Sequence, residues 1–88
     1  MLKINECAVE WRLVDGEIIA LDLASEEYLA VNRTGAALWP LLAAGATEDD
    51  LTDQLVRVFD VPAPAASADV ATFVAGLRTR GLLTAAQR

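Results

Sequence analysis

Residues 27–39, EYLAVNRTGAALW, change from a strand-like pattern to a helix-like pattern with almost no linker between them. Residues 28–31 read as a short strand, and the good helix formers of residues 36–38 follow at once. Asn32 or Thr34 can cap the N-terminus of that helix by accepting a hydrogen bond from a free backbone N–H. This switch predicts an α+β chain in which a strand leads directly into a helix.

Two further strands are predicted before this one. In residues 8–14, AVEWRLV, apolar side chains alternate with charged ones, which is typical of a half-buried strand. Asp15-Gly16 then supplies a tight hairpin turn, because both residues tolerate a positive φ. Residues 17–23, EIIALDL, are expected to pair back on the first strand, and a second short turn leads to residues 28–31. The result is a three-stranded antiparallel meander with its last strand at one edge.

Three helices are predicted after the sheet. The first extends toward Gly45, and Pro40 is expected to kink or shorten it, because proline lacks an N–H and crowds the preceding turn. The second begins at Thr47 with a capping-box pattern, and the acidic residues 48–50 suit the positive end of the helix dipole. Both helices therefore have clear sequence signals at their ends.

The third helix is predicted to follow a proline-rich loop at residues 60–66, DVPAPAA, with Ser67 as its N-cap and Gly81 at its end. Leu82 and Leu83 are expected to form an apolar tail beneath the domain. Along the helix, apolar residues recur at the spacing i, i+3, i+4 and i+7, namely at Val70, Phe73, Val74 and Leu77.

No linker or internal repeat interrupts these elements, so residues 1–88 are predicted to form a single domain with a core of about residues 9–84. Trp11 and Trp39 are expected to anchor that core. No apolar run approaches the roughly 18 residues of a membrane span, and the N-terminal MLKINECAVEW lacks the apolar stretch of a signal peptide. The sequence therefore predicts a cytoplasmic α+β domain, with a three-stranded antiparallel sheet followed by three helices.

Several classes of chemistry have no residues to support them. The chain has no histidine, so Ser/His/Asp and Cys/His arrangements are impossible within it. Cys7 is the single cysteine and reads as a packed or idle thiol, while a zinc site would need carboxylates with this one thiol. The scattered glycines form no phosphate-binding loop. We therefore expect a non-catalytic protein without a metal or a cofactor.

The net charge of −6 disfavours a nucleic-acid partner, because the chain repels a phosphate backbone at long range. A winged-helix DNA-binding regulator stays open as an alternative, since the predicted helical bundle is similar. Such a regulator needs a basic third helix. This helix has Asp69 near one end and only Arg78 and Arg80 near the other.

Several segments together resemble the PqqD family of peptide-binding domains, also called RiPP recognition elements. RiPPs are peptides that are made on the ribosome and then modified. The similar segments, within about residues 9–84, are ALDLASEEYLAVNRTGAALWPLL, GATEDDLTDQL, FDV and ADVATFVAGLRTRGLL. The resemblance implies a winged-helix-like fold, in agreement with the periodicity. It also implies that the domain binds the leader segment of a precursor peptide and presents it to modifying enzymes.

The edge of the third strand offers a mechanism for such binding. An edge strand exposes unpaired N–H and C=O groups, and a peptide that adds there as a further strand satisfies them. The resemblance places this peptide in a groove between the third strand and the third helix. It implies a pairing edge formed by Tyr28, Leu29, Ala30, Val31 and Asn32. It also implies an apolar wall formed by Val70, Phe73, Val74 and Leu77. The charged rim that it implies consists of Asp69, Arg78 and Arg80.

Each of these side chains also has a purely structural interpretation. The apolar stripe of the third helix can serve as core alone, Tyr28 can be a packing residue, and Arg78 and Arg80 can form a solvated helix end favoured by the dipole. Backbone pairing by residues 28–32 depends least on side chains.

A free-standing domain of this size is most similar to the leader-binding protein of lasso-peptide clusters. The implied partners are the leader of a precursor peptide, a separate leader peptidase of the cysteine-protease type and an ATP-dependent macrolactam cyclase. Neither nucleic acid nor a membrane is implied. Within the same family, a PqqD-type peptide chaperone that serves a radical SAM enzyme is the alternative.

Overall fold

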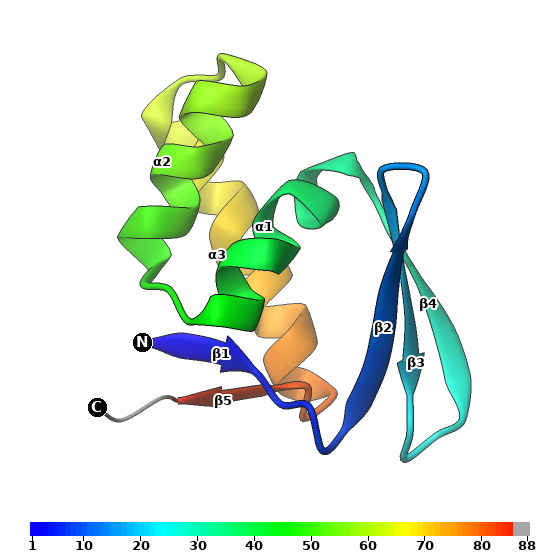
Figure 1. The fold of residues 1–88 in the computed structure, drawn as a ribbon. Helices are drawn as coiled ribbons and strands as arrows, with labels where there is room; N and C mark the ends of the chain where they lie inside the picture. Colours follow the sequence, from blue (N-terminus) through cyan, green and yellow to red (C-terminus); the bar gives the residue numbers. More distant parts are fainter. Residues whose placement is uncertain (86–88) are drawn as a thin grey trace.

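The computed structural model describes residues 1–85, which form five strands and three helices (Figure 1). In chain order these are β1 (Leu2–Ile4), β2 (Val9–Val14), β3 (Glu17–Asp22), β4 (Glu27–Val31), α1 (Arg33–Ala44), α2 (Glu48–Phe59), α3 (Ala63–Thr79) and β5 (Leu83–Ala85). The predicted order of a three-stranded meander followed by three helices is confirmed.

Strands β2, β3 and β4 form one antiparallel sheet in that order, so β2 and β4 are its two edges. In register, Trp11 lies opposite Ala20, which in turn lies opposite Leu29. The β2–β3 hairpin turns at Asp15 and Gly16, whose φ values are 53° and 79°, as the sequence predicts. Both edges lack a further strand within residues 1–85.

The hydrogen bonds between β2 and β3 determine which backbone groups stay free at the β2 edge. The N–H of Leu23 donates to the carbonyl of Ala8 at 3.0 Å, and this pair continues the register of the two strands. In an antiparallel pair, directly bonded residues alternate with residues that bond outward. Val9, Trp11 and Leu13 therefore turn their N–H and C=O groups away from the sheet.

A second, two-stranded sheet of β1 and β5 was not predicted. Leu2 lies opposite Ala85 and Ile4 opposite Leu83. Leu2 and Ala46 also exchange backbone hydrogen bonds of 2.7 and 2.9 Å, which ties β1 to the connection between α1 and α2. In the predicted tail, Leu83 is therefore the first residue of a paired strand, and Leu82, which precedes it, is fully buried.

Helix α1 begins as predicted, but Pro40 does not shorten it. Asn32, rather than Thr34, is its N-cap, and its Oδ1 accepts a hydrogen bond from the Gly35 N–H at 2.8 Å. The helix continues through Pro40 to Ala44, so the prediction of a shortened helix was wrong. Proline removes one backbone hydrogen bond here, but complete burial of the neighbours Leu38, Trp39 and Leu42 stabilises the helix on both sides of it.

Helix α2 has the predicted capping box. The Asp50 N–H donates to Thr47 Oγ1 at 3.1 Å, and the Thr47 N–H donates to Asp50 Oδ2 at 3.0 Å.

The predicted start of α3 was wrong. The helix begins at Ala63 instead of after Ser67, so residues 63–66 of the predicted loop are helical. Pro64 lies in the first turn, where a backbone N–H has no partner within the helix and proline costs little. Ala66 is fully buried, which stabilises the additional turn.

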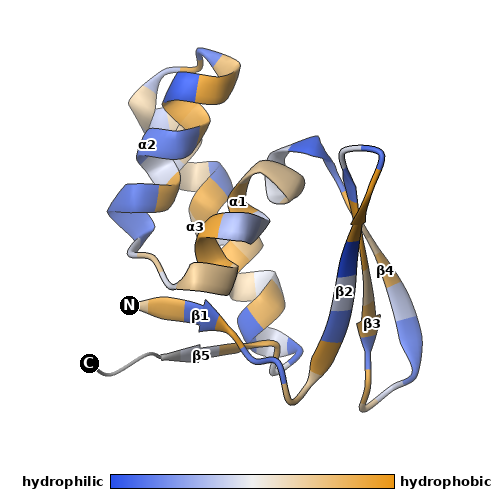
Figure 2. Ribbon diagram, viewed as in Figure 1, coloured by the Kyte–Doolittle hydropathy of each residue, from blue (hydrophilic) through white to orange (hydrophobic). Residues whose placement is uncertain are grey.

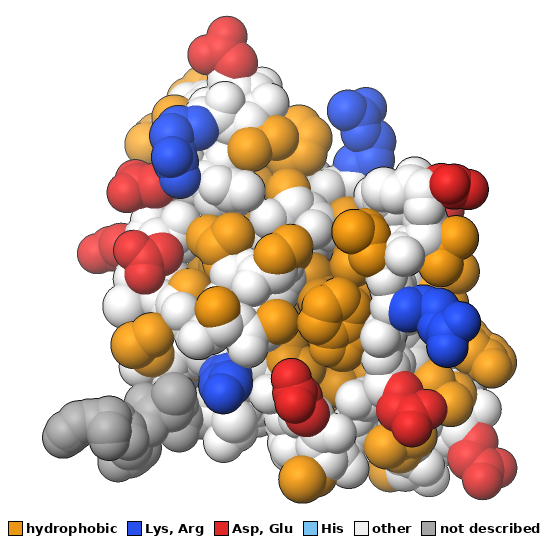
Figure 3. All heavy atoms as spheres, viewed as in Figure 1, with side chains coloured by type: hydrophobic (Ala, Val, Ile, Leu, Met, Phe, Trp, Pro, Cys, Tyr) orange, Lys and Arg blue, Asp and Glu red, His pale blue; other side chains and the backbone are white. Residues whose placement is uncertain are grey.

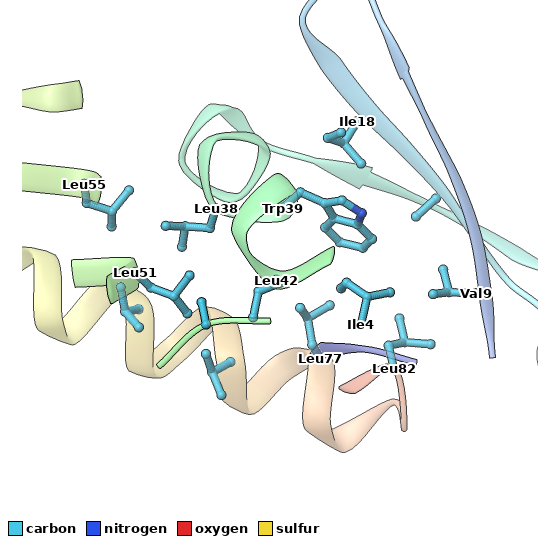
Figure 4. Close-up of a cluster of buried hydrophobic side chains, with 14 of the residues drawn as sticks. Ile4, Val9, Ile18, Leu38, Trp39, Leu42, Leu51, Leu55, Leu77 and Leu82 are labelled. Carbon is cyan, nitrogen blue, oxygen red and sulfur yellow. The ribbon is translucent and has the colours of Figure 1, made fainter. Parts of the chain in front are cut away.

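The core lies between α1 and the inner face of the sheet and extends between the helices (Figure 4). Trp39 is fully buried at its centre, as expected for an anchor, whereas Trp11 is half-buried. The two indole rings meet edge to face with centroids 6.0 Å apart. Figure 2 shows hydrophobic residues recurring along α1 and α3, while the start of α2 is hydrophilic. No helix in the described part of the chain is long and apolar enough to cross a membrane.

Candidate functional site

The free edge of β4 follows from the same alternation that governs β2. Within β3, the residues that bond to β2 alternate with Ile18, Ala20 and Asp22, which bond to β4. Their partners in β4 are Val31, Leu29 and Glu27. Residues 28 and 30 therefore direct their N–H and C=O groups outward, where no strand of the described chain meets them.

The side chains of β4 divide between the two faces of the sheet. Leu29 and Val31 point inward and are half-buried, while Tyr28 points outward and is 74 % exposed. Ala30 is exposed on the same outer face as Tyr28. A strand of this kind has an apolar inner side, an accessible outer side and an unpaired backbone between them.

Helix α3 approaches β4 at Phe73. A Cβ atom placed on Gly35, in the first turn of α1, would lie 2.7 Å from Phe73 Cε1 and 2.7 Å from Val31 Cγ1. These distances are shorter than carbon atoms tolerate, so only glycine lets the three elements meet. Asn32, the last residue before α1, uses its side chain to cap that helix. The abrupt change from strand to helix thus brings α3 against the end of β4.

At the other end of β4, α3 is joined to the sheet by charge. Arg80 Nη1 lies 3.5 Å from Asp22 Oδ2 and 3.7 Å from Glu27 Oε1. Asp22 is 4 % exposed, and its Oδ1 also accepts hydrogen bonds from the backbone N–H groups of Ala24 and Ser25. A nearly buried carboxylate needs such partners. The Arg80 contacts therefore hold the C-terminal end of α3 beside the start of β4.

Between these two contacts α3 presents an open stretch. Phe73, Gly76 and Arg80 lie three and four residues apart, on one flank of the helix, and Asp69 precedes Phe73 by four residues. A Cβ atom at Gly76 would meet nothing within 4 Å. We call this flank, together with the outward edge of β4, the β4–α3 face.

The structure places the residues of the predicted apolar wall at different depths. Val70, Val74 and Leu77 are 1 %, 2 % and 6 % exposed and belong to the core, whereas Phe73 is half-buried beside β4. The predicted rim also divides. Arg78 is exposed but lies two residues from Arg80, a spacing that places the two side chains on different sides of a helix.

The sequence analysis did not single out Asp22, Glu27 or Gly76 as site residues. The sequence does contain one signal for Asp22. It is an acidic residue at an inward position of the strand 17–23, and a buried carboxylate requires a hydrogen-bond or ion-pair partner. The geometry allows peptide-like pairing at β4. Among residues 1–85, no group of three or more Cys, Asp or Glu side chains is placed to hold a metal ion.

Together, the fold and the site define a class of small α+β domain in which a three-stranded antiparallel sheet ends in an unpaired strand beside a three-helix bundle. Residues 17–83 match the family model described as "Coenzyme PQQ synthesis protein D (PqqD)". The chain therefore belongs to the PqqD family, as the sequence resemblance predicted. No curated protein matches it.

Two solved structures are similar over nearly their whole length. One, "TbiB1 in Complex with the TbiA(beta) Leader Peptide", is 26 % identical with a TM-score of 0.84, and the match covers 98 % of this chain and 99 % of that chain. The other, "Lasso peptide synthetase B1 complexed with the leader peptide", is 24 % identical with a TM-score of 0.80 and coverages of 94 % and 96 %. The second likeness supports the fold alone.

Proposed function

We propose that the protein is a non-catalytic recognition element that binds the leader segment of a ribosomal precursor peptide as an added strand on β4. The observation that carries this proposal is the outward backbone of Tyr28 and Ala30, in the strand whose last residue, Val31, meets Phe73 of α3 around Gly35. Strand addition takes its affinity from main-chain hydrogen bonds and its specificity from alternate side chains. Family membership and the leader-bound TbiB1 structure support the same function.

The alternation of the sheet specifies what the leader presents to each face. A leader residue opposite Tyr28 or Ala30 places its side chain on the outer face with them. The leader residues between those positions point inward, toward the side of Leu29 and Phe73. We therefore expect apolar side chains at alternate leader positions, and charged leader residues toward the ends of α3, where Asp69 and Arg80 lie.

In this role the protein presents the bound leader to a leader peptidase of the cysteine-protease type and to an ATP-dependent macrolactam cyclase. The leader-bound TbiB1 structure supports a leader peptide as the partner, and the lasso-peptide pathway rests on the sequence resemblance described above. The family description favours the second candidate, a PqqD-type chaperone for a radical SAM enzyme. Helix α3 gives little support to DNA binding, because Arg80 is already paired with two carboxylates.

The test uses proline to remove one free N–H from each edge of the sheet. Proline is tolerated at an edge where its nitrogen faces solvent, so Ala30→Pro and Leu13→Pro leave the hydrogen bonds to β3 in place. Fluorescence polarisation measures binding of labelled leader peptides from the precursor genes next to this one. We expect Ala30→Pro to weaken binding about tenfold or more, since a backbone hydrogen bond and the close approach are both lost.

Leu13→Pro is the matched control, and it should bind the leader as the wild type does. Circular dichroism of both variants checks that they are folded. Equal affinity of wild type and folded Ala30→Pro would contradict pairing on β4, and failure of the wild type to bind any neighbouring leader would contradict the function itself.

A further inference from the structure

The β2 edge is a second open edge, on the opposite side of the sheet from β4. Val9, Trp11 and Leu13 direct their backbone groups outward there. A shallow hollow of about 690 Å³ lies over the outer face of the sheet, and its lining runs from Glu10 and Arg12 of β2 across β3 to Tyr28 of β4. Native proteins usually cover or blunt such an edge, because its free N–H and C=O groups pair readily with another strand.

The apolar side chains along β2 are only partly covered. Leu13 lies on the inner face of the sheet and is still 62 % exposed, and Trp11 is half-buried against Trp39. Helix α1 packs mainly over β3 and β4 and reaches β2 through the contact between Trp39 and Trp11. On the face shown in Figure 3, where β2 is the nearest strand, hydrophobic side chains gather between the helices and the sheet. There is therefore room for further structure beside β2.

The sequence of β2 is complementary to itself in one register. Suppose that β2 strands of two copies pair antiparallel about a two-fold axis, with their outward-bonding residues opposite one another. Most of the strand takes part in the pairing only if the axis passes through residue 10, 11 or 12. Centring on residue 10 or 12 places Glu10 opposite Glu10, or Arg12 opposite Arg12. Centring on Trp11 places Glu10 opposite Arg12 of the second copy, and does so twice.

We propose that β2 pairs with β2 of a second copy of this chain, antiparallel and centred on Trp11. On the outer face the dimer contains two Glu10–Arg12 pairs. On the inner face Val9 lies opposite Leu13 of the second copy, and the two Trp11 side chains are neighbours. The exposed Leu13 is covered, and the result is a continuous six-stranded sheet with a β4 edge at each end. The proposal is independent of leader binding, since it uses the other edge.

Charge reversal tests both the surface and the register. Sedimentation equilibrium of the wild type up to about 1 mM chain should show a reversible dimer, in the affinity range of weak interfaces. Glu10→Arg or Arg12→Glu alone places like charges opposite each other twice and should raise the dissociation constant about tenfold or more. The double variant Glu10→Arg/Arg12→Glu restores complementarity and should return to within about threefold of the wild type.

Glu17→Arg is the matched control, because it makes the same change of charge on the neighbouring strand, outside residues 9–13. It should leave the dissociation constant unchanged. Glu10, Arg12 and Glu17 are all exposed, and circular dichroism confirms that the variants are folded. A wild type that stays monomeric, singles that associate like the wild type, or a double variant that does not recover would each refute the proposal.

Disulfide trapping gives a second measurement of the register. In a Cys7→Ser background, Glu10→Cys and Arg12→Cys chains are oxidised separately and as a mixture. Residues 10 and 12 of the two copies form a pair without direct backbone bonds, whose Cα atoms lie about 4.5 Å apart and suit a disulfide. The mixture should therefore yield a cross-linked dimer that neither chain forms alone. Efficient cross-linking of either single chain would show a different register.

Discussion

At the scale of single residues, Gly35 and Gly76 show two opposite uses of a missing side chain. Both lie within helices beside β4. The side chains of Phe73 and Val31 pack closely against Gly35. Because Gly35 has no Cβ, the three elements can be in contact there. Gly76 has open space around its Cα. Gly35 lies within a segment that resembles the family, but its contact with Phe73, which lies far along the chain in α3, could not be predicted from that segment.

We predict that Gly35→Ala destabilises the protein by about 1–3 kcal/mol, because the overpacking outweighs the helix preference of alanine. Gly76→Ala, the matched variant, should stabilise it by about 0.5–1 kcal/mol, since the helix gains a better residue at a position with no neighbour. Urea denaturation measures both. Equal effects of the two substitutions would show that the Gly35 contacts do not constrain the fold.

Glu26 and Asp22 illustrate what sequence could and could not predict at this scale. Glu26 lies in the short turn predicted before residues 28–31, and its φ is positive, at 59°. A residue in that conformation needs support from its surroundings. Asp22 supplies it by accepting hydrogen bonds from Ala24 and Ser25 and by pairing with Arg80. The turn was predictable, whereas its link to α3 across the chain was not.

At the scale of elements, the strong local signals were reliable and the weak ones were not. The strands β2 to β4 and the capping box of α2 have periodicity or polar caps that can be identified in a few consecutive residues. Strand β1 has only three residues, too few to show a period of two, and its partner β5 lies at the far end of the chain. The start of α3 was wrong because a proline in a first turn resembles a proline in a loop.

The β1 strand is expected to contribute strongly to stability despite its length. Ile4 is 2 % exposed and packs in the central core. We predict that Ile4→Ala lowers the free energy of unfolding by about 2–5 kcal/mol, because it removes buried methyl groups and leaves a cavity. Thermal and urea denaturation measure the loss. Lys3→Ala, in the same strand but exposed, should change stability by less than about 0.5 kcal/mol. A small effect of Ile4→Ala would mean that β1 is dispensable.

At the scale of the whole molecule, the two edges of one sheet serve two different partners in our proposals. Edge β4 lies beside α3 and takes a peptide, while β2 lies on the other side of β3 and takes a second copy. The strand and the helix beside the candidate peptide site were predicted from their sequence patterns, whereas the peptide site itself was implied by the family resemblance and stays a prediction. The degree to which the apolar residues of α3 are buried could not be predicted, since burial of Val70, Val74 and Leu77 depends on how α2 and α3 pack together.

We predict that leader binding and self-association are independent, because β3 separates the two edges. The dimer should bind one leader per chain, with the affinity shown by the weakly associating Glu10→Arg variant. Sedimentation velocity with a labelled leader measures stoichiometry and association together. If saturating leader instead splits the dimer, the two partners compete for the same edge and the register centred on Trp11 is wrong.

The β1–β5 pair has a practical consequence for joining this domain to other proteins. Leu2 lies opposite Ala85, so the first and last strands run side by side next to α1 and α3. The chain therefore enters β1 and leaves β5 on the same side of the domain. A short linker between the two ends should also permit circular permutation, with new ends opened in the Asp15-Gly16 turn and both sheet edges left intact.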